Sequence, residues 1–353
     1  MACVRCVSTS SVAIVAALAL ALAACGGAPG GTDPNGPSEE SGKAGTLFLA
    51  GVGELWTVDV AAERAEHLRM PELAAGDPPH RIAAIGDRLA LWGYDIAGVP
   101  IADPSGSPAM LANNAWIFIP AAEADRIWVG YLDPESPATE RALGELREID
   151  ADGNVITRGV EPPDGAWPYA ELTSGLLFQG PGSVRLWNPE SGRTVRTYPL
   201  QEIGDMGPVS GDLLASCPDR CEELVLTDFA AGEQRRIQAP RGLAFVAFEA
   251  AFSPDGATLA VPVTEAGGGR SSYSTHDREL ALVSLESGET EIVPDSTVSA
   301  DYVFTAWSPA GDRVFMTGGE RRAAREIVAY GLGEARARVL DVELGDFYDI
   351  ATG

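Results

Sequence analysis

Two cysteines could carry redox or metal chemistry, because they lie only four positions apart in Cys217-Pro-Asp-Arg-Cys221. A pair at this spacing can close a disulfide, act as a redox pair or offer two thiolates to a metal ion. The chain has three histidines, none near this pair in sequence, and the other three of its five cysteines lie within the first 25 residues. With no further ligand to complete a metal site, we expect a disulfide across a tight turn, provided that the chain is exported.

A second group of candidate residues is basic or aromatic and lies in irregular stretches of the chain. Its members are Arg270, Tyr273, His276, Arg321, Arg322 and Arg325, with Trp167 from a connection further upstream. In a chain of formal net charge −26, clustered guanidinium groups can receive a carboxylate or an acidic segment of a protein partner. The alternative is that these are solvated charges on loops.

Residues that could carry catalysis are sparse. His67, His80 and His276 are far apart in sequence, and no Gly-x-Ser-x-Gly nucleophile elbow is present. Carboxylates are numerous, with 51 Asp and Glu residues, so a glycosidase-type pair could assemble in the folded chain. We expect no catalytic residues and no cofactor.

One acidic stretch has the oxygen spacing of a calcium loop. Asp150, Asp152, Asn154 and Glu161 occupy the first, third, fifth and twelfth positions of an EF-hand pattern. However, Val155 stands where that loop requires a glycine, and the flanking residues have the pattern of strands. An Asp-Gly-Asn turn between two strands explains the same residues, so we expect no metal here.

The N-terminus has the composition of an export signal. Arg5 precedes the apolar stretch Val12–Ala24, which is too short to span a bilayer and ends in Leu22-Ala-Ala-Cys25. This ending resembles the lipobox of bacterial lipoproteins, whose cysteine is acylated and becomes the first residue. The alternative is an ordinary secretory signal with an incidental cysteine.

The lipoprotein resemblance implies a particular division of the chain. Residues 1–24 would be the signal peptide, and Cys25 would carry acyl chains such as palmitate that hold the protein on the extracytoplasmic side of the cell membrane. Residues 25–45 are nearly devoid of apolar side chains and predict a flexible tether. Residues 46–353 remain for the folded domain.

The elements that position the candidate residues follow a repeat. Seven segments pair a short apolar strand with a turn and a returning strand, at 55–68, 99–112, 146–159, 184–198, 224–237, 280–293 and 327–340. Equivalent points in these segments are 44, 47, 38, 40, 56 and 47 residues apart. A repeat of roughly 40–50 residues in an all-β pattern predicts a seven-bladed β-propeller, each blade having four antiparallel strands from a (innermost) to d (outermost).

The two ends of the folded domain complement each other. The first blade lacks an innermost strand, whereas the tail DFYDIATG (346–353) is a strand without a partner. We expect this tail to pair within Thr46–Met70 and to close the ring.

Two blades carry a family resemblance. The segments FSPDGATLA (252–260) and WSPAGDRVF (307–315) are similar to the WD-repeat-like blades of TolB-type proteins. The resemblance is good in blades six and seven, partial in four and five, and poor in one to three. It implies the propeller fold and little about activity, because function depends on sites placed on that fold.

Loop lengths suggest which face binds. The b–c loops at 132–145, 217–221, 264–279 and 317–326 are longer than the a–b and c–d turns. Long loops usually carry binding residues, so we predict a binding face formed by the b–c loops and d–a connections, around the mouth of the central channel.

The net charge and the sequence motifs together limit the classes of function that the protein could have. The acidic chain excludes a nucleic-acid partner, which would need a basic footprint. We predict a lipid-anchored, non-catalytic propeller that binds a protein partner or ligand in the cell envelope. The alternative is a propeller enzyme that acts on a carbohydrate or lactone through carboxylates at the channel mouth.

Overall fold

The computed structural model describes residues 45–51, 54–70, 81–93, 95–135, 142–163, 165–267, 276–300, 303–319 and 325–353. The expected signal peptide, Cys25 and nearly all of the tether lie outside these residues. The statements below concern the compact unit Lys43–Gly353. Within the described part of the chain, no helix has the length and apolar character needed to cross a membrane.

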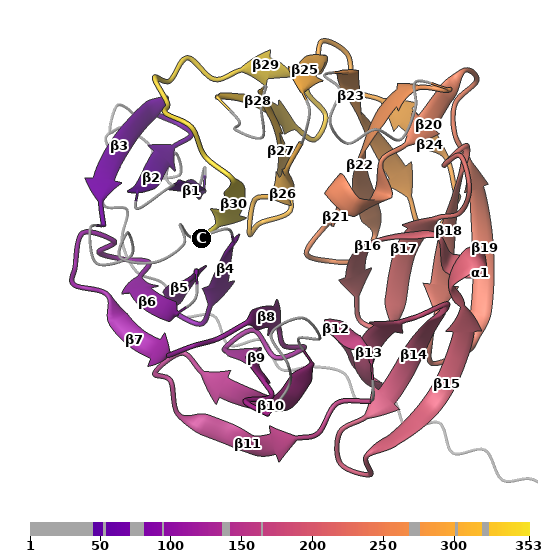
Figure 1. The fold of residues 1–353 in the computed structure, drawn as a ribbon. Helices are drawn as coiled ribbons and strands as arrows, with labels where there is room; N and C mark the ends of the chain where they lie inside the picture. Colours follow the sequence, from indigo (N-terminus) through magenta and orange to yellow (C-terminus); the bar gives the residue numbers. More distant parts are fainter. Residues whose placement is uncertain are drawn as a thin grey trace, which may run out of the picture. The chain divides into compact units, whose positions relative to one another are not determined.

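Seven antiparallel sheets are arranged around a central axis, which confirms the predicted seven-bladed β-propeller (Figure 1). Blades 1 to 3, each from the innermost strand outward, are as follows. They comprise β30 (Asp349–Thr352), β1 (Thr46–Gly51), β2 (Glu54–Asp59) and β3 (Arg64–Arg69); β4 (Arg81–Ile85), β5 (Arg88–Trp92), β6 (Ile96–Pro100) and β7 (Ala109–Ala112); and β8 (Ile117–Pro120), β9 (Arg126–Leu132), β10 (Leu143–Asp150) and β11 (Val155–Val160).

Blades 4, 5 and 7 also have four strands each. They comprise β12 (Trp167–Leu172), β13 (Gly175–Gly180), β14 (Ser183–Asn188) and β15 (Arg193–Pro199); β16 (Asp205–Ser210), β17 (Leu213–Cys217), β18 (Glu223–Asp228) and β19 (Glu233–Gln238); and β26 (Thr305–Trp307), β27 (Arg313–Gly318), β28 (Glu326–Gly331) and β29 (Arg338–Val339). A short helix, α1 (Leu200–Ile203), joins blades 4 and 5.

Blade 6 departs from the expected continuous strand a. Its inner edge is split into β20 (Leu243–Phe245) and β21 (Ala251–Phe252), separated by the 3-10 turn η3 (Ala247–Glu249). The outer strands are β22 (Thr258–Glu265), β23 (His276–Ser284) and β24 (Thr290–Ile292), and β25 (Val298–Ala300) pairs with the other end of β23. The predicted four-strand repeat of a blade did not reveal this interruption.

Seven hydrophobic clusters fill the spaces between neighbouring sheets. Side chains alternate between the two faces of a strand, so each inner blade strand supplies two clusters. In β1, Leu47 and Leu49 pack towards blade 7, whereas Phe48 and Ala50 pack towards blade 2. A blade is therefore buried on both faces only when both neighbours are present.

The C-terminal strand closes the ring as predicted. β30 pairs antiparallel with β1, in a register that places Leu47 opposite Thr352 and Ala50 opposite Asp349. Phe347 is fully buried and joins the cluster between blades 7 and 1. The chain end lies near the centre of the ring (Figure 1).

The tight turns form as the sequence indicated. In the a–b turn of blade 6, the Ser253 hydroxyl donates a 2.6 Å hydrogen bond to Asp255 and accepts one of 2.9 Å from the Thr258 N–H. Ser308 plays the same part in blade 7, donating to Asp312 at 2.7 Å. Gly256 and Gly311 have φ of +68° and +71°, which glycine adopts at little cost.

The calcium-like stretch is a hairpin turn between β10 and β11. One Asp150 oxygen accepts the N–H groups of Asp152 at 2.9 Å and Asn154 at 2.8 Å, and the other accepts the Asn154 amide at 2.9 Å. Asp152 in turn binds Arg88 of the neighbouring blade at 3.1 Å. These carboxylates therefore serve the turn and the contact between blades 2 and 3.

Candidate functional site

The central channel of the propeller is a cavity of about 760 Å³ to which all seven blades contribute. Its wall is formed mainly by β4, β8, β12 and β16, with Phe248 and Ala250 of blade 6, Phe304 before β26, and Asp349 of β30. These elements surround the axis in Figure 1. Ligand-binding cavities in proteins typically measure about 300–1,000 Å³, so the channel has room for a small molecule or a protruding peptide segment.

The channel has two distinct mouths because every strand a runs in the same direction across the disc. Each strand a begins at the face of the d–a connections and b–c loops, here called the b–c mouth, and ends at the face of the a–b turns. Arg81 and Asp349 begin β4 and β30, so they lie towards the b–c mouth. Glu171 is the penultimate residue of β12 and lies towards the opposite mouth.

Asp349 is held by backbone donors of the ring closure. One of its oxygens accepts the N–H of Ile82 on β4 at 2.9 Å, and the other accepts the N–H of Ile350 at 2.9 Å. Burial raises the pKa of Asp349 to about 6, although the two N–H groups and the Arg81 charge oppose this change. The carboxyl therefore links β30 to β4 and titrates close to neutral pH.

Arg81 is the one cation among the described residues that line the channel. Its side chain is exposed, and it forms no hydrogen bond or ion pair in the described part of the chain. Its positive charge nevertheless acts on the channel interior, since it opposes the rise in the pKa of both Asp349 and Tyr169 that burial causes. The guanidinium is thus available at the b–c mouth.

The middle of the channel is aromatic. Tyr169 donates a 2.7 Å hydrogen bond to the Gly207 carbonyl, and burial raises the pKa of its phenol to about 12, so the ring stays neutral. Phe248 on η3 is 49% exposed although it lines the channel. A large apolar side chain with this much exposure inside a cavity is typical of a binding surface.

A glycine makes room for η3. A Cβ atom on Gly207 would overlap the Ala247 carbonyl of η3, so the close approach of blades 5 and 6 requires glycine at this position. The 3-10 turn therefore brings Phe248 to the channel surface only because β16 carries Gly207.

Glu171 is the carboxylate of the described channel lining that lies towards the a–b mouth. It accepts the Ala122 N–H at 2.6 Å, which fixes it against the a–b turn of blade 3. Burial raises the pKa of Glu171, and the Ala122 N–H opposes that change. Together with Asp349, it gives the described channel lining two carboxylates and no histidine.

A second hollow, of about 620 Å³, lies on the b–c face between blades 3 and 4. Trp167 lines it with Tyr131 and several prolines and carboxylates. The expectation that Trp167 lies in a loop was wrong, because it is the first residue of β12 and is 36% exposed. The Trp-Pro pair at 167–168 was misleading, because proline is tolerated in an edge strand such as β12, which has its second edge at the channel.

Most of the predicted basic and aromatic binding residues fall on parts of the chain that the structure does not describe, so their grouping into one site stays a prediction. Arg270, Tyr273, Arg321 and Arg322 lie outside the described residues. His276 begins β23, opposite Ala300, and Arg325 forms an ion pair with Asp346 at 2.6 Å. Neither Arg325 nor His276 lines the central channel.

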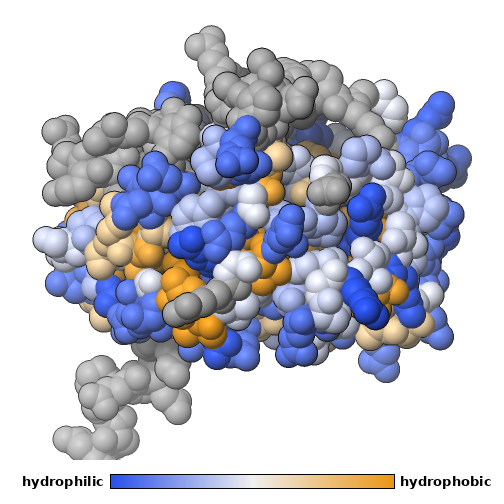
Figure 2. All heavy atoms as spheres, turned by 60° about the horizontal axis from the view of Figure 1, so that its bottom comes forward, coloured by the Kyte–Doolittle hydropathy of each residue, from blue (hydrophilic) through white to orange (hydrophobic). Residues whose placement is uncertain are grey.

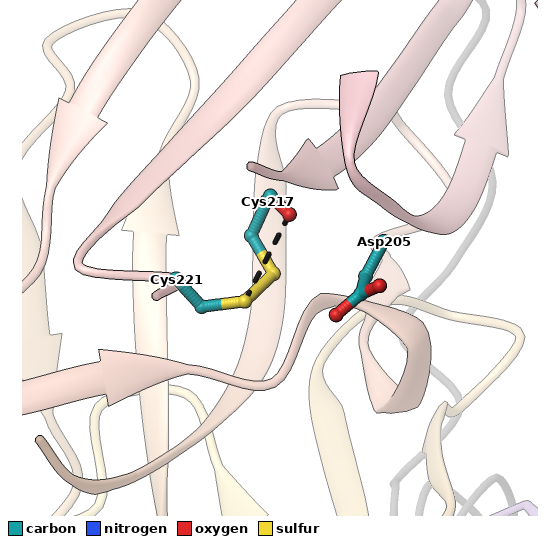
Figure 3. Close-up of side chains that lie close together, drawn as sticks. All are labelled: Asp205, Cys217 and Cys221. Carbon is teal, nitrogen blue, oxygen red and sulfur yellow. Dashed lines mark hydrogen bonds between the residues drawn. A yellow bond between two sulfur atoms is a disulfide. The ribbon is translucent and has the colours of Figure 1, made fainter. Parts of the chain in front are cut away.

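The cysteine pair forms the predicted disulfide. Cys217 and Cys221 join the b–c loop of blade 5 and are buried against blade 6 in the cluster between the two blades. Asp205 lies beside them, and one ligand atom of each of the three residues lies within 4.8 Å of the others (Figure 3). Metal binding requires thiolates, so in the disulfide form this group is a staple between β17 and β18.

A buried charge pair was not predicted from the sequence. Glu249 of η3 lies 3.8 Å from Arg278 of β23, and both side chains are almost fully buried. Burial raises the pKa of Glu249 to about 7, and the Arg278 charge opposes that change. A single glutamate in the apolar run FVAFEAAF (245–252) was the available signal.

The visible rim offers no large apolar patch. Figure 2 shows the molecule from the side on which β11 lies in Figure 1. On this side, hydrophobic residues form separate patches among hydrophilic ones. On this side of the molecule, a broad hydrophobic interface is not favoured, and the concave channel is the more distinctive feature.

The fold and the channel together define the class of the protein: a closed, all-β, seven-bladed propeller with an open central cavity. No protein-family model matches the chain, and no curated protein matches it.

Solved structures with the same architecture do match. A candidate 6-phosphogluconolactonase from Bacteroides fragilis is 11% identical, with 90% of this chain and 100% of that chain covered and a TM-score of 0.54. AztD from Citrobacter koseri is 13% identical, with 88% of each chain covered and a TM-score of 0.47. Hydrazine synthase from Kuenenia stuttgartiensis is 12% identical, with 71% and 76% covered and a TM-score of 0.46. At such low identity the likeness concerns the fold alone.

Proposed function

We propose that this protein is a non-catalytic binding module of the cell envelope, which takes up a ligand through the b–c mouth of its channel. Acyl chains on Cys25 hold it at the extracytoplasmic face of the membrane, and residues 25–45 act as a tether. The ligand is a small molecule or a protruding segment of an envelope protein.

One observation carries this proposal. The channel contains an exposed phenylalanine, Phe248, and an exposed arginine, Arg81, in a cavity of about 760 Å³. Apolar surface with a few convergent polar groups is the usual composition of a ligand site. Gly207 lets η3 pack closely between blades 5 and 6. The phenyl ring of Phe248 is therefore held at the channel surface by a packed part of the fold.

The alternative of a carbohydrate- or lactone-cleaving enzyme receives less support. Paired-carboxylate hydrolysis needs its two acids on either side of one bond, about 5–10 Å apart. Glu171 and Asp349 lie towards opposite mouths, and each already accepts backbone N–H groups. The B. fragilis protein named for lactonase activity resembles this chain in fold only.

A photocrosslinking experiment on intact cells tests the binding function. Phe248 is replaced by p-benzoylphenylalanine, and Val195, which is 59% exposed on the outer strand β15, receives the same residue as a matched control. We expect a specific adduct from position 248 that is absent from position 195. Identical adduct patterns at the two positions, or none at 248, would overturn the proposal.

The enzyme alternative makes a different prediction in the same system. If Glu171 and Asp349 performed hydrolysis, the Glu171→Gln variant would accumulate an uncleaved ligand in the crosslinked product, whereas the wild type would not. For a binding module, the mass of the captured species is the same in both proteins.

The anchor is tested separately. The Cys25→Ala variant should move from the membrane pellet to the soluble fraction of broken cells, because the acyl chains have lost their attachment point. A variant that still sediments with the membranes would show that Cys25 is not the anchor, without bearing on the channel.

A further inference from the structure

We infer that the ligand of the channel is an amphipathic anion, whose acidic group binds Arg81 at the b–c mouth while its apolar body packs against Phe248. This inference rests on the proposed binding function and adds the chemical class of the ligand.

The first support is the state of Arg81. Several arginines of the described chain pair with carboxylates, such as Arg126 with Glu123 at 2.8 Å and Arg147 with Glu145 at 2.7 Å, whereas others form no ion pair; of these others, Arg81 is the one that lines the channel. Arg81 has no such partner, even though the whole chain has a formal net charge of −26. A planar guanidinium without a partner is suited to bind a carboxylate, sulfonate or phosphate.

The nearby carboxylate does not satisfy this arginine. Asp349 forms no ion pair with Arg81 in the described part of the chain, and its oxygens accept the N–H groups of Ile82 and Ile350. Both oxygens of Asp349 are therefore engaged by backbone N–H groups where β30 meets β4. Space therefore remains at the b–c mouth for an anion from outside.

The second support is the apolar surface in the same cavity as this cation. Phe248, Phe304 and Tyr169 line the same cavity as Arg81, and each comes from a different blade. The Tyr169 hydroxyl is already bonded to the Gly207 carbonyl, which leaves its ring as the available surface. A ligand that covers these rings must have an apolar or aromatic body.

Charge also determines which way the ligand points. Each mouth carries one carboxylate of the described lining, Asp349 at the b–c mouth and Glu171 towards the a–b mouth, but the one cation of that lining, Arg81, lies at the b–c mouth and attracts an anionic group there. The ligand therefore enters with its body leading towards the middle of the channel and its acid at the b–c mouth.

A pair of fluorescent probes tests this inference on the purified protein. The first, 8-anilinonaphthalene-1-sulfonate, has an aromatic body and an anionic group, and the second, N-phenyl-1-naphthylamine, has the same rings without the sulfonate. Both brighten in apolar surroundings, so each dissociation constant can be measured by titration. We expect the wild type to bind the sulfonate at least tenfold more tightly than the neutral probe.

Two channel variants and two rim variants separate the contributions. Arg81→Gln should weaken the sulfonate about tenfold and leave the neutral probe within twofold, as expected for the loss of one charged hydrogen-bonding partner. Phe248→Ala should weaken both probes. The controls Arg193→Gln and Val195→Ala alter exposed residues of β15 and should change neither.

The outcomes separate this inference from the binding function. If Arg81→Gln binds the sulfonate as tightly as the wild type, or if the neutral probe binds as tightly as the sulfonate, the ligand is not an anion held by Arg81. A specific adduct at position 248 in that case would leave the binding function standing. Failure of both experiments would remove both proposals.

Discussion

At the scale of single residues, two buried carboxyl groups, Asp349 at the channel and Glu249 behind it in blade 6, have protonation states that depend on their surroundings. Asp349 and Glu249 both have raised pKa values, about 6 and about 7, because burial disfavours their charged forms. Arg81 and Arg278 oppose these shifts without cancelling them. The folded state therefore holds protons that the unfolded chain releases at lower pH.

This difference predicts how stability depends on pH. Between the ordinary value of 3.8 and about 6, folded Asp349 binds more protons than unfolded Asp349, so the free energy of unfolding falls as pH rises through this window. The loss is at most about 3 kcal/mol, from about 1.4 kcal/mol per pKa unit. Asp349→Asn should flatten this slope in urea denaturation from pH 4 to 7.5, leaving the part due to Glu249.

A matched substitution controls for the change of charge. Asp87 is exposed in the turn between β4 and β5, so Asp87→Asn removes one carboxylate without touching the ring closure. It should keep the wild-type slope. An unchanged slope in Asp349→Asn would mean that the carboxyl of Asp349 is not coupled to folding.

At the scale of elements, the departures from regular strands are what shape the channel. β20 and β21 are separated by η3, which places Phe248 in the cavity and Glu249 beside Arg278. The segments 252–260 and 307–315, on which the family resemblance rested, form the turns at Ser253 and Ser308, because such turns depend on neighbours in sequence. The η3 interruption depends on Gly207 of the next blade, so local pattern could not show it.

Gly207 gives a direct test of this packing. Gly207→Ala would place a Cβ atom against the Ala247 carbonyl, a backbone atom that can yield only if η3 moves. We expect a loss of about 1–3 kcal/mol, typical of overpacking, and weaker binding of the fluorescent sulfonate. Gly180→Ala is the control, since its Cβ would meet Ala166 at an ordinary 3.5 Å. Equal stability of the two variants would show that η3 is not tightly seated.

The disulfide also stabilises the packing between two elements of the fold. It closes a loop between β17 and β18 within the cluster shared by blades 5 and 6, and the Phe245 N–H donates to the Cys221 carbonyl at 2.8 Å. The double variant Cys217→Ala, Cys221→Ala should lose about 2 kcal/mol of stability in the chain-entropy model for so short a loop. Treatment of the wild type with dithiothreitol should give a similar loss. A shift in neither experiment would mean that blade packing alone holds this loop.

At the scale of the whole molecule, the ring turns local repeats into one cooperative unit. The strands, hairpins and closing tail followed from periodicity and from a first blade without strand a, so the sequence predicted most of the fold. The channel site could not be predicted from the sequence. It is lined by residues that are far apart in sequence and reach the same cavity only when the propeller closes, namely Arg81, Tyr169, Phe248 and Asp349. Trp167 was predicted to lie in a connection on the binding face, whereas it is the first residue of β12.

Closure predicts that the last eight residues stabilise the whole domain. Truncation after Gly345 removes β30 with Phe347, which takes side chains out of the clusters on both sides of blade 1 and leaves the inner edge of β1 unpaired. It also removes Asp349, which ties β30 to Ile82 of blade 2. We expect the melting temperature in differential scanning calorimetry to fall by well over 5 °C, because contacts with both neighbouring blades are lost.

A permuted chain distinguishes the loss of the strand from the loss of a chain terminus. The end of β30 lies beside the start of β1, with Leu47 opposite Thr352 and the Gly353 N–H 3.2 Å from the Thr46 carbonyl. Residues 346–353 can therefore be moved ahead of Gly45 and joined by a short turn, making strands a and b of blade 1 a hairpin. The permuted chain should recover the melting temperature that truncation removes. If truncation has no effect, or if the permuted chain stays as unstable as the truncated one, β30 does not close the ring in the way that the pairing with β1 indicates.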